Sequence, residues 1–303
     1  MKNKSKNILK IFPIGGLGNQ LFIYFAGRHL ADELGRELRI DLTLASKFGT
    51  KHRGDISSFQ LPGTFLSRNS FTRSFGYFLR IDKRLIRRIS IYRKLRLFIF
   101  GYFNSTELGY NKEMATLKRV RSIHGYFQTW KYYEFYKEFH KDFFRIQGQS
   151  RWFSETLASI ERIKPIALHI RRGDYNDLKE EFGILSNEYY VLSLKLMKKN
   201  FGEKEVWVFS DDIPAAKKTL NSIDGQNISY ITPPKESAPI ESMMLMSRCP
   251  AIIIANSTFS YWAALIQSDD KLVVAPTKWF RGRVDPLDLI PPNWERVEST
   301  WEE

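Results

Sequence analysis

The sequence predicts an α/β fold built on parallel sheets, and three observations lead to this prediction. Short apolar runs alternate with segments of helical spacing through the second half of the chain. The chain also opens with an apolar run, a glycine-rich turn and a helical pattern. The first apolar run carries no polar alternation, as expected for a strand that is buried on both faces. Strands that alternate with helices indicate a sheet covered by helices on both sides.

The first half of the chain is predicted to begin as a Rossmann-like unit. Residues 7–14 are expected to form a strand, residues 21–34 a helix and residues 38–42 a second strand. The turn at 15–20 lacks the spacing of the dinucleotide-binding motif G-x-G-x-x-G. It is therefore either a capped tight turn or a loop whose glycines let a ligand approach the helix N-terminus. Residues 130–144 are predicted to form an aromatic helix.

The second half alternates throughout. Helices are predicted at residues 152–163, 187–199, 214–220, 240–247 and 257–267. Strands are predicted at residues 165–170, 205–209, 228–231, 251–255 and 271–275. The 303 residues suffice for one large or two moderate domains, and the polar stretch near 146–155 is the expected boundary. We therefore predict an N-terminal domain at 1–150 and a C-terminal domain at 151–303.

Residues 77–100 show a basic amphipathic pattern. Five basic residues fall on one helical face, opposite an apolar stripe: Arg80, Lys83, Arg84, Arg87 and Arg88. Such a helix is typical of an anionic membrane surface or a partner-binding face, and also of a surface helix packed on the core. The choice between these interpretations stays open.

The net charge of +14 favours an anionic partner, which is nucleic acid, an acidic membrane or a phosphorylated substrate. The five histidines and the single cysteine, Cys249, show no metal-ligand spacing. Because one cysteine forms no internal disulfide, a reducing compartment is favoured. No signal peptide and no apolar run of about 18 residues are visible. We expect a cytoplasmic protein, soluble or peripheral at the inner membrane.

Polar clusters follow three predicted strands, at 169–174, 210–212 and 256–260. Ligands of open α/β sheets bind outside the carboxyl ends of the strands. The three clusters are therefore expected to converge on one crevice.

The residue types in this crevice suit a nucleotide. Arg171 and Arg172 match phosphate oxygens, although a solvated turn in a basic protein is the alternative interpretation. Hydroxyl groups follow at the start of a predicted helix, on Ser257, Thr258 and Ser260. Asp211 or Asp212 could accept hydrogen bonds from a purine. Helix capping is the alternative for the hydroxyls and the aspartates.

Five ordered motifs, taken together, resemble bacterial α-1,2-fucosyltransferases of glycosyltransferase family 11. They are Gly15-Gly16-Leu17-Gly18-Asn19-Gln20, Gly125-Tyr126-Phe127-Gln128, His169 to Tyr175, Phe209-Ser210-Asp211-Asp212 and Asn256-Ser257-Thr258-Phe259-Ser260. The resemblance implies a GT-B-like fold, with two Rossmann-like domains facing across a cleft. The N-terminal domain would bind the acceptor and the C-terminal domain the nucleotide sugar. It implies inverting transfer of L-fucose from GDP-fucose to the 2-hydroxyl of a galactoside, without cofactor or metal.

The resemblance also assigns the site. Donor binding is expected from His169, Arg171, Arg172, Asp211, Asp212, Asn256, Ser257, Thr258, Ser260, Gly16 and Gly18. Catalytic roles are expected for Arg171, Arg172, Asp174 and Asn19. Asp174 is the nearest candidate base, Glu180 and Glu181 are the alternatives, and a structural role in which Asp174 holds the arginines in place stays open. The expected acceptor is a galactose-terminated oligosaccharide or a lipid-linked glycan of O-antigen or surface polysaccharide synthesis, and an anionic membrane surface is a further candidate partner.

Two alternatives remain open at this point. A GDP-sugar transferase of another linkage or acceptor would use the same scaffold. A basic nucleic-acid-binding protein would also explain the charge. The polar clusters gather at sheet ends rather than along a basic stripe, so no nucleic-acid partner is expected.

Overall fold

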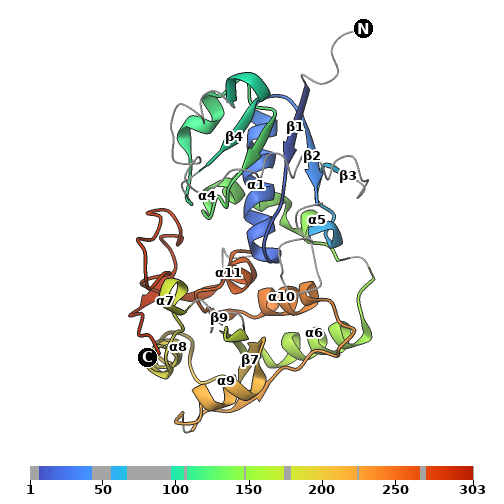
Figure 1. The fold of residues 1–303 in the computed structure, drawn as a ribbon. Coiled ribbons are helices and arrows are strands. Elements are labelled where there is room, and N and C mark those ends of the chain that lie inside the picture. The colour runs from blue at the N-terminus through green and yellow to red at the C-terminus, as the bar shows by residue number, and fades with distance from the viewer. Residues whose placement is uncertain are drawn as a thin grey trace. The chain divides into compact units, whose positions relative to one another are not determined.

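A computed structural model describes residues 7–42, 56–66, 97–105, 108–146, 148–173, 179–223, 225–266 and 271–302. The chain divides into two compact units, Met1–Arg145 and Ile146–Glu303 (Figure 1). The division falls close to the boundary predicted after residue 150. Each unit contains one parallel sheet.

The sheet of the first unit has the strand order β3-β2-β1-β5-β4. Its strands are β1 (Ile8–Ile11), β2 (Glu37–Asp41), β3 (Thr64–Leu66), β4 (Tyr102–Asn104) and β5 (Ser122–His124). Its helices are α1 (Leu17–Glu33), α4 (Lys131–Glu134) and α5 (His140–Phe143), with 3-10 turns η2 (Ile56–Ser58), η4 (Lys112–Thr116) and η5 (Lys137–Phe139). The chain adds β2 and β3 on one side of β1 and β5 and β4 on the other. The order of the strands therefore reverses between β1 and β5, which is where α/β sheets bind ligands.

Helix α1 is buried along most of its length because it packs on β1 and β2 with one side and on α4 with another. A β-carbon on Gly27 would lie 2.3 Å from Cγ2 of Ile11 in β1, so the helix approaches the strand through this glycine. The close contact fixes where the N-terminus of α1 lies relative to the end of β1.

The predicted aromatic helix at 130–144 is wrong as a single helix. The segment is broken into α4, η5 and α5, and its rings surround Phe25 of α1. The ring centroids of Tyr133, Tyr136, Phe143 and Phe144 lie 5.0, 5.9, 6.3 and 6.1 Å from that of Phe25. A straight helix could not turn side chains so far apart in sequence toward one ring.

The sheet of the second unit has the order β11-β10-β9-β6-β7-β8. Its strands are β6 (Ile166–Ile170), β7 (Val206–Ser210), β8 (Ile228–Tyr230), β9 (Ala251–Ile253), β10 (Leu272–Pro276) and β11 (Glu295–Val297). Counted from β6, this is the 3-2-1-4-5-6 order of the Rossmann fold. The order reverses between β6 and β9.

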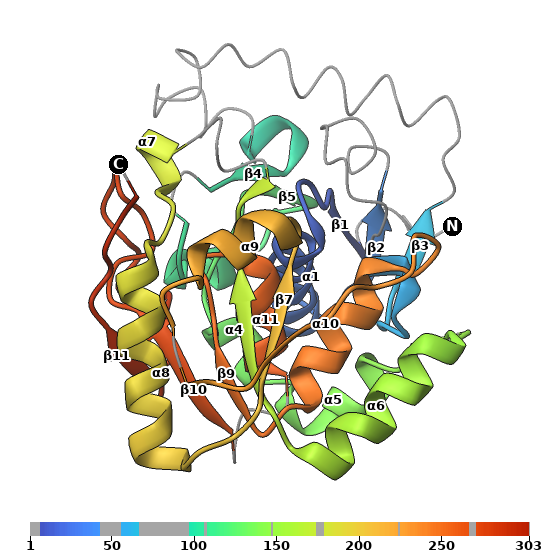
Figure 2. The ribbon, with the colours of Figure 1, turned by 90° about the horizontal axis from the view of Figure 1, so that it is seen from below.

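Helices cover both faces of this sheet (Figure 2). They are α6 (Arg151–Ile163), α7 (Lys179–Phe182), α8 (Asn187–Phe201), α9 (Ile213–Thr219), α10 (Pro239–Arg248) and α11 (Thr258–Leu265). Side chains of α8 and α9 form one core cluster with the strands, and α10 packs against α6 and α11. In Figure 2, α8 lies on the other side of the strands from α6 and α10.

Most predicted elements are found within a few residues of their expected bounds. The sequence missed the three-residue strands β3, β4, β5 and β11, which are too short to show a hydrophobic period. Residues 77–96 of the predicted basic helix lie outside the described residues, and 97–100 form one helical turn. In the part of the chain that the structure describes, no helix has the length and apolar character needed to cross a membrane.

Gly27→Ala should destabilise the protein. The new methyl group overlaps Ile11, and overpacking of this kind costs about 1–3 kcal/mol, which outweighs the gain of up to about 1 kcal/mol in helix propensity. Urea unfolding followed by circular dichroism measures the change. Gly16→Ala is the comparison: its β-carbon would meet nothing within 4 Å, so it should lose only the smaller amount that alanine costs at an N-cap. A Gly27→Ala variant as stable as the wild type would contradict the close contact.

Candidate active site

In the second unit, the point where the strand order reverses brings His169 of β6 next to the start of α11, which follows β9. The ring centroids of His169 and Phe259 are 5.9 Å apart. His169 is 3% exposed, and its Nδ1 has no hydrogen-bond partner among the described residues. An unpaired buried ring nitrogen is costly, so this position is suited to a polar ligand group.

Burial, together with the nearby positive charge of Arg171, lowers the pKa of His169 to about 3. The imidazole is therefore neutral at physiological pH. It can form hydrogen bonds with a ligand through one donor and one acceptor nitrogen, but it adds no positive charge to the site.

Asp211, which follows β7, holds the loop that follows β6. One carboxylate oxygen lies 3.2 Å from the guanidinium of Arg171, and the other accepts a 3.0 Å hydrogen bond from the backbone N–H of Arg172. A β-carbon on Gly173 would lie 2.4 Å from the same carboxylate. The sequence Arg-Arg-Gly thus lets the loop close around Asp211. The predicted contact of Asp211 with a purine would have to compete with these bonds.

Arg172 was predicted to contact phosphate, but in the structure its side chain points into the protein. Its side chain is 5% exposed, and its guanidinium donates to Thr219 Oγ1 at 2.8 Å, the carbonyl of Leu185 at 3.0 Å and the carboxylate of Glu302 at 2.8 Å. In this structure Arg172 anchors the loop, and Arg171 is the arginine of the pair that remains for an anion. Sequence reasoning did not find Thr219 and Glu302, because they lie 47 and 130 residues away.

Two residues of the predicted site cap helices, as the alternative interpretation held. Asp212 accepts a 2.9 Å bond from the N–H of Ala215 at the start of α9. Ser257 accepts a 3.4 Å bond from the N–H of Phe259 at the start of α11.

Ser260 and Asn256 are also occupied by the protein. The Ser260 hydroxyl is buried and lies 3.3 Å from the carbonyl oxygen of Ser257. The Asn256 amide donates to the carbonyls of Phe182, Gly183 and Trp279 at 2.8, 3.2 and 3.2 Å. Thr258 is partly exposed as the first residue of α11. Asp174 lies outside the described residues.

In the first unit, the glycine-rich turn brings amide side chains together at the end of β1. Gly15 has φ +75°, and a β-carbon there would lie 2.9 Å from Nδ2 of Asn19. Gln20 donates to the carbonyl of Gly15 at 2.9 Å and accepts from the N–H of Ile56 at 3.3 Å. Gln128, which follows β5, donates to Asn19 Oδ1 at 3.0 Å.

The two other glycines of the predicted site belong to the helix start. Gly16 is the N-cap residue of α1, and Gly18 is buried in its first turn. A tight turn into a helix therefore explains both residues, and the N-terminus of α1 remains the part of the turn that can meet a ligand.

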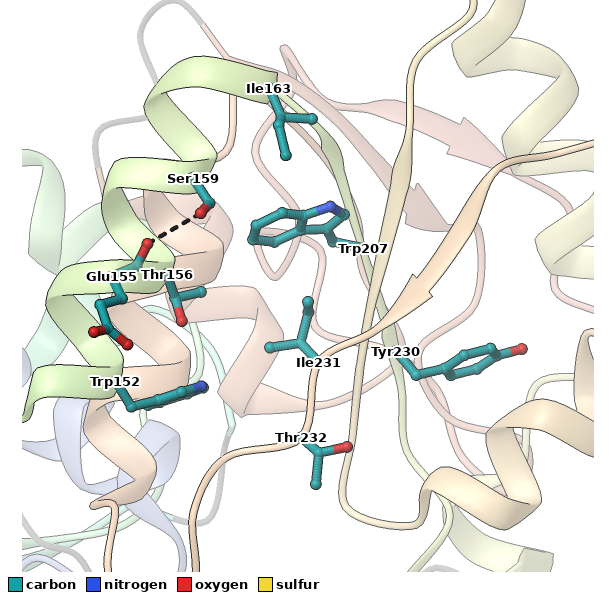
Figure 3. A pocket seen from close by; sticks show the side chains of 9 residues that line it. All are labelled: Trp152, Glu155, Thr156, Ser159, Ile163, Trp207, Tyr230, Ile231 and Thr232. Carbon is teal, nitrogen blue, oxygen red and sulfur yellow. Dashed lines mark hydrogen bonds between the residues drawn. The ribbon is translucent and has the colours of Figure 1, made fainter.

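A groove of about 300 Å³ lies between α6 and the strands β7 and β8, away from these residues (Figure 3). It is lined by Trp152, Glu155, Thr156, Ser159, Ile163, Trp207, Tyr230, Ile231 and Thr232. Two of its polar groups already have protein partners, because Glu155 pairs with Arg151 at 2.6 Å and the indole of Trp207 donates to Glu205 at 2.8 Å. None of the predicted site residues contributes to this groove.

The chain belongs to glycosyl transferase family 11, whose family model matches residues 9–294. It is therefore a glycosyltransferase. It is 30% identical to an α-1,2-colitosyltransferase of Escherichia coli, over 94% of this chain and 97% of that protein. It is 29% identical to the O-antigen biosynthesis glycosyltransferase WbnK of the same species, over 92% and 97% of the two chains. It is 22% identical to human galactoside α-(1,2)-fucosyltransferase 1, over 44% and 38%.

Among solved structures, the chain is similar to a mutant form of FUT1 from Arabidopsis thaliana in complex with GDP. The TM-score is 0.50 at 13% identity, over 88% of this chain and 70% of that one. The likeness shows the fold alone. The predicted GT-B-like class of two Rossmann-like domains is confirmed.

The low pKa of His169 predicts a pH dependence of stability. Its folded pKa of about 3 lies below the usual 6.5, so unfolding takes up a proton between these values and stability falls as the pH drops from 6.5 toward 3. The expected slope is at most about 1.4 kcal/mol per pH unit. Urea unfolding at pH 4, 5, 6 and 7 should show a shallower decline for His169→Gln than for the wild type. Parallel declines would show that the imidazole is not buried neutral.

Proposed function

We propose that the protein transfers L-fucose from GDP-fucose to the 2-hydroxyl of a galactoside with inversion, in the synthesis of O-antigen or another surface glycan. Membership of the family supports glycosyl transfer. The similarity to an α-1,2-colitosyltransferase and to galactoside α-(1,2)-fucosyltransferases supports the linkage, and the similarity to WbnK supports the pathway.

The observation that carries the donor site is the grouping of His169, Arg171 and the N-terminus of α11 where the strand order reverses. The guanidinium of Arg171 supplies a fixed positive charge and two-pronged hydrogen bonding for a diphosphate. The N–H groups at the start of α11 and the Thr258 hydroxyl supply further donors. The neutral imidazole of His169 would bind the nucleotide by hydrogen bonding.

The proposed reaction is a displacement at the anomeric carbon of fucose. The 2-hydroxyl oxygen of the acceptor forms a bond to this carbon, while the bond from the carbon to the β-phosphate oxygen breaks and GDP leaves with the electron pair. Arg171 stabilises the charge that develops on the phosphate, in place of a divalent metal. The hydroxyl proton passes to a base, for which Asp174 is the candidate.

Colitosyl transfer is the second candidate, because the chain is 30% identical to the colitosyltransferase over nearly its whole length. Comparing the GDP derivatives of fucose and of colitose at equal concentrations decides between the two. Higher kcat/KM with the colitose derivative would replace fucose as the transferred sugar and leave the nucleotide site unchanged.

Calorimetric titration in EDTA should show binding of GDP and much weaker binding of ADP and UDP. Arg171→Met should lower kcat/KM for GDP-fucose by about 10²- to 10³-fold, because a contact that strengthens in the transition state is lost. Arg151→Met is the matched control, since Arg151 is exposed and pairs with Glu155 on the surface of α6. Equal affinity for the three nucleotides, or a variant at position 171 as active as the control, would refute the donor site.

Residues 77–100 are proposed to bring the enzyme to an anionic membrane that carries a lipid-linked acceptor. The segment ends in Phe98, Ile99 and Phe100, which are 68, 54 and 47% exposed. Co-sedimentation should be several-fold stronger with vesicles in which about one lipid in three is phosphatidylglycerol than with neutral vesicles, and should weaken with salt. Equal sedimentation with both vesicle types would refute a membrane role for the segment.

A further inference from the structure

Asn19 and Gln128 form a pair of side chains that spans the place where the strand order reverses in the first unit. Asn19 is the third residue of α1, which follows β1, and Gln128 lies shortly after β5. β1 and β5 are neighbours in the sheet. The hydrogen bond between the two amides therefore joins the carboxyl ends of two adjacent strands across 109 positions of sequence.

The direction of this hydrogen bond decides what Asn19 can offer to a ligand. Gln128 Nε2 donates to Asn19 Oδ1 at 3.0 Å, so the oxygen of the Asn19 amide already accepts one hydrogen bond from the protein. No described residue accepts a hydrogen bond from Asn19 Nδ2, and the Asn19 side chain is only partly buried. Nδ2 lies against the turn at Gly15, where a β-carbon would come within 2.9 Å, and its N–H groups have no acceptor among the described residues.

Gln128 lies in a buried and sharply turned segment, which keeps its side chain beside Asn19. It is 6% exposed, and the backbone before it is turned by Gly125 at φ +149° and Phe127 at φ +51°. The ring of Phe127 is fully buried, with its edge against Tyr132 at a centroid distance of 6.3 Å. Gln128 Oε1 is buried and has no hydrogen-bond donor among the described residues, so this amide is also short of one partner.

The surroundings of Asn19 also offer donors rather than acceptors. The first turn of α1 contains no acidic residue, and its N-terminal N–H groups carry the positive end of the helix dipole. Donors of this kind bind oxygen lone pairs. An uncharged amide beside them suits a sugar hydroxyl, whose oxygen accepts from Asn19.

We propose that Gln128 is a positioning residue that turns the N–H groups of Asn19 toward a hydroxyl oxygen of the acceptor sugar. This inference rests on the proposed function. It goes further by giving Asn19 the role of donor and by assigning that orientation to Gln128.

Two substitutions test the direction of the bond. In Gln128→Glu the carboxylate only accepts hydrogen bonds, so Asn19 must turn its N–H groups inward and its oxygen outward. In Asn19→Asp the bond from Gln128 is kept, but the outward donor is lost. Each variant should raise KM for the acceptor at least tenfold, with a GDP affinity close to that of the wild type. Thermal unfolding checks that Gln128→Glu is still folded, because burying a carboxylate destabilises the protein. Gln60→Glu, at an exposed position of the same unit, controls for the added charge.

Gln128→Leu completes the test, because it removes the bond and leaves Asn19 free to rotate. Its acceptor KM should lie between that of the wild type and that of Gln128→Glu. If Gln128→Glu and Asn19→Asp both keep the acceptor KM of the wild type, Asn19 presents its oxygen or makes no contact, and the inference is refuted. A wild type that transfers no sugar from either GDP donor refutes the proposed function itself, which is a different result.

Discussion

The carboxylate of Asp211 connects the ends of β6 and β7, and the geometry of the candidate donor site depends on it. It binds the side chain of Arg171 and the backbone of Arg172 at once, at 3.2 and 3.0 Å. Without this shared contact, the long side chain of Arg171 would be free to sample many rotamers before binding an anion. With it, the guanidinium is held at the end of β6 near His169, and the carboxylate partly balances its charge.

The two units share one local feature, a glycine packed against a polar side chain, but the side chains differ in charge. In each one a glycine lets a polar side chain come very close to the backbone: Gly173 beside Asp211, and Gly15 beside Asn19. In the second unit the group held in this way positions an arginine. In the first unit the groups are uncharged amides. Charged donors suit a diphosphate and neutral ones suit a sugar. The difference is therefore consistent with our proposal that the second unit binds the nucleotide sugar and the first unit binds the acceptor.

The sequence predicted the class of fold and the position of the polar clusters after β6, β7 and β9, because these depend on local patterns. Apolar runs, helical spacing and polar residues at strand ends are all visible within short windows. The role of Arg172 was not predictable in this way, because its partners Thr219 and Glu302 are distant in the sequence and come close only when the chain is folded. The capping roles of Asp212 and Ser257 were available as alternatives, because Asp212 lies two residues before one predicted helix and Ser257 is the first residue of another. The broken helix around Phe25 was not predictable, because the breaks follow from the packing of the rings and not from the spacing of apolar residues in the sequence.

The contact between Arg172 and Glu302 also affects the order in which the second unit can fold. Residues 301 and 302 lie beside the segment at 184–185, through the bridge of Leu185 with Trp301 and the bond from the N–H of Glu302 to the carbonyl of Ile184. The loop after β6 therefore completes its hydrogen bonds with a part of the chain made 130 residues later. Contacts this distant in sequence form late and slow folding. During synthesis on the ribosome, the sheet around β6 and β7 can assemble first, whereas the arginine loop reaches its final form only after residue 302 has emerged.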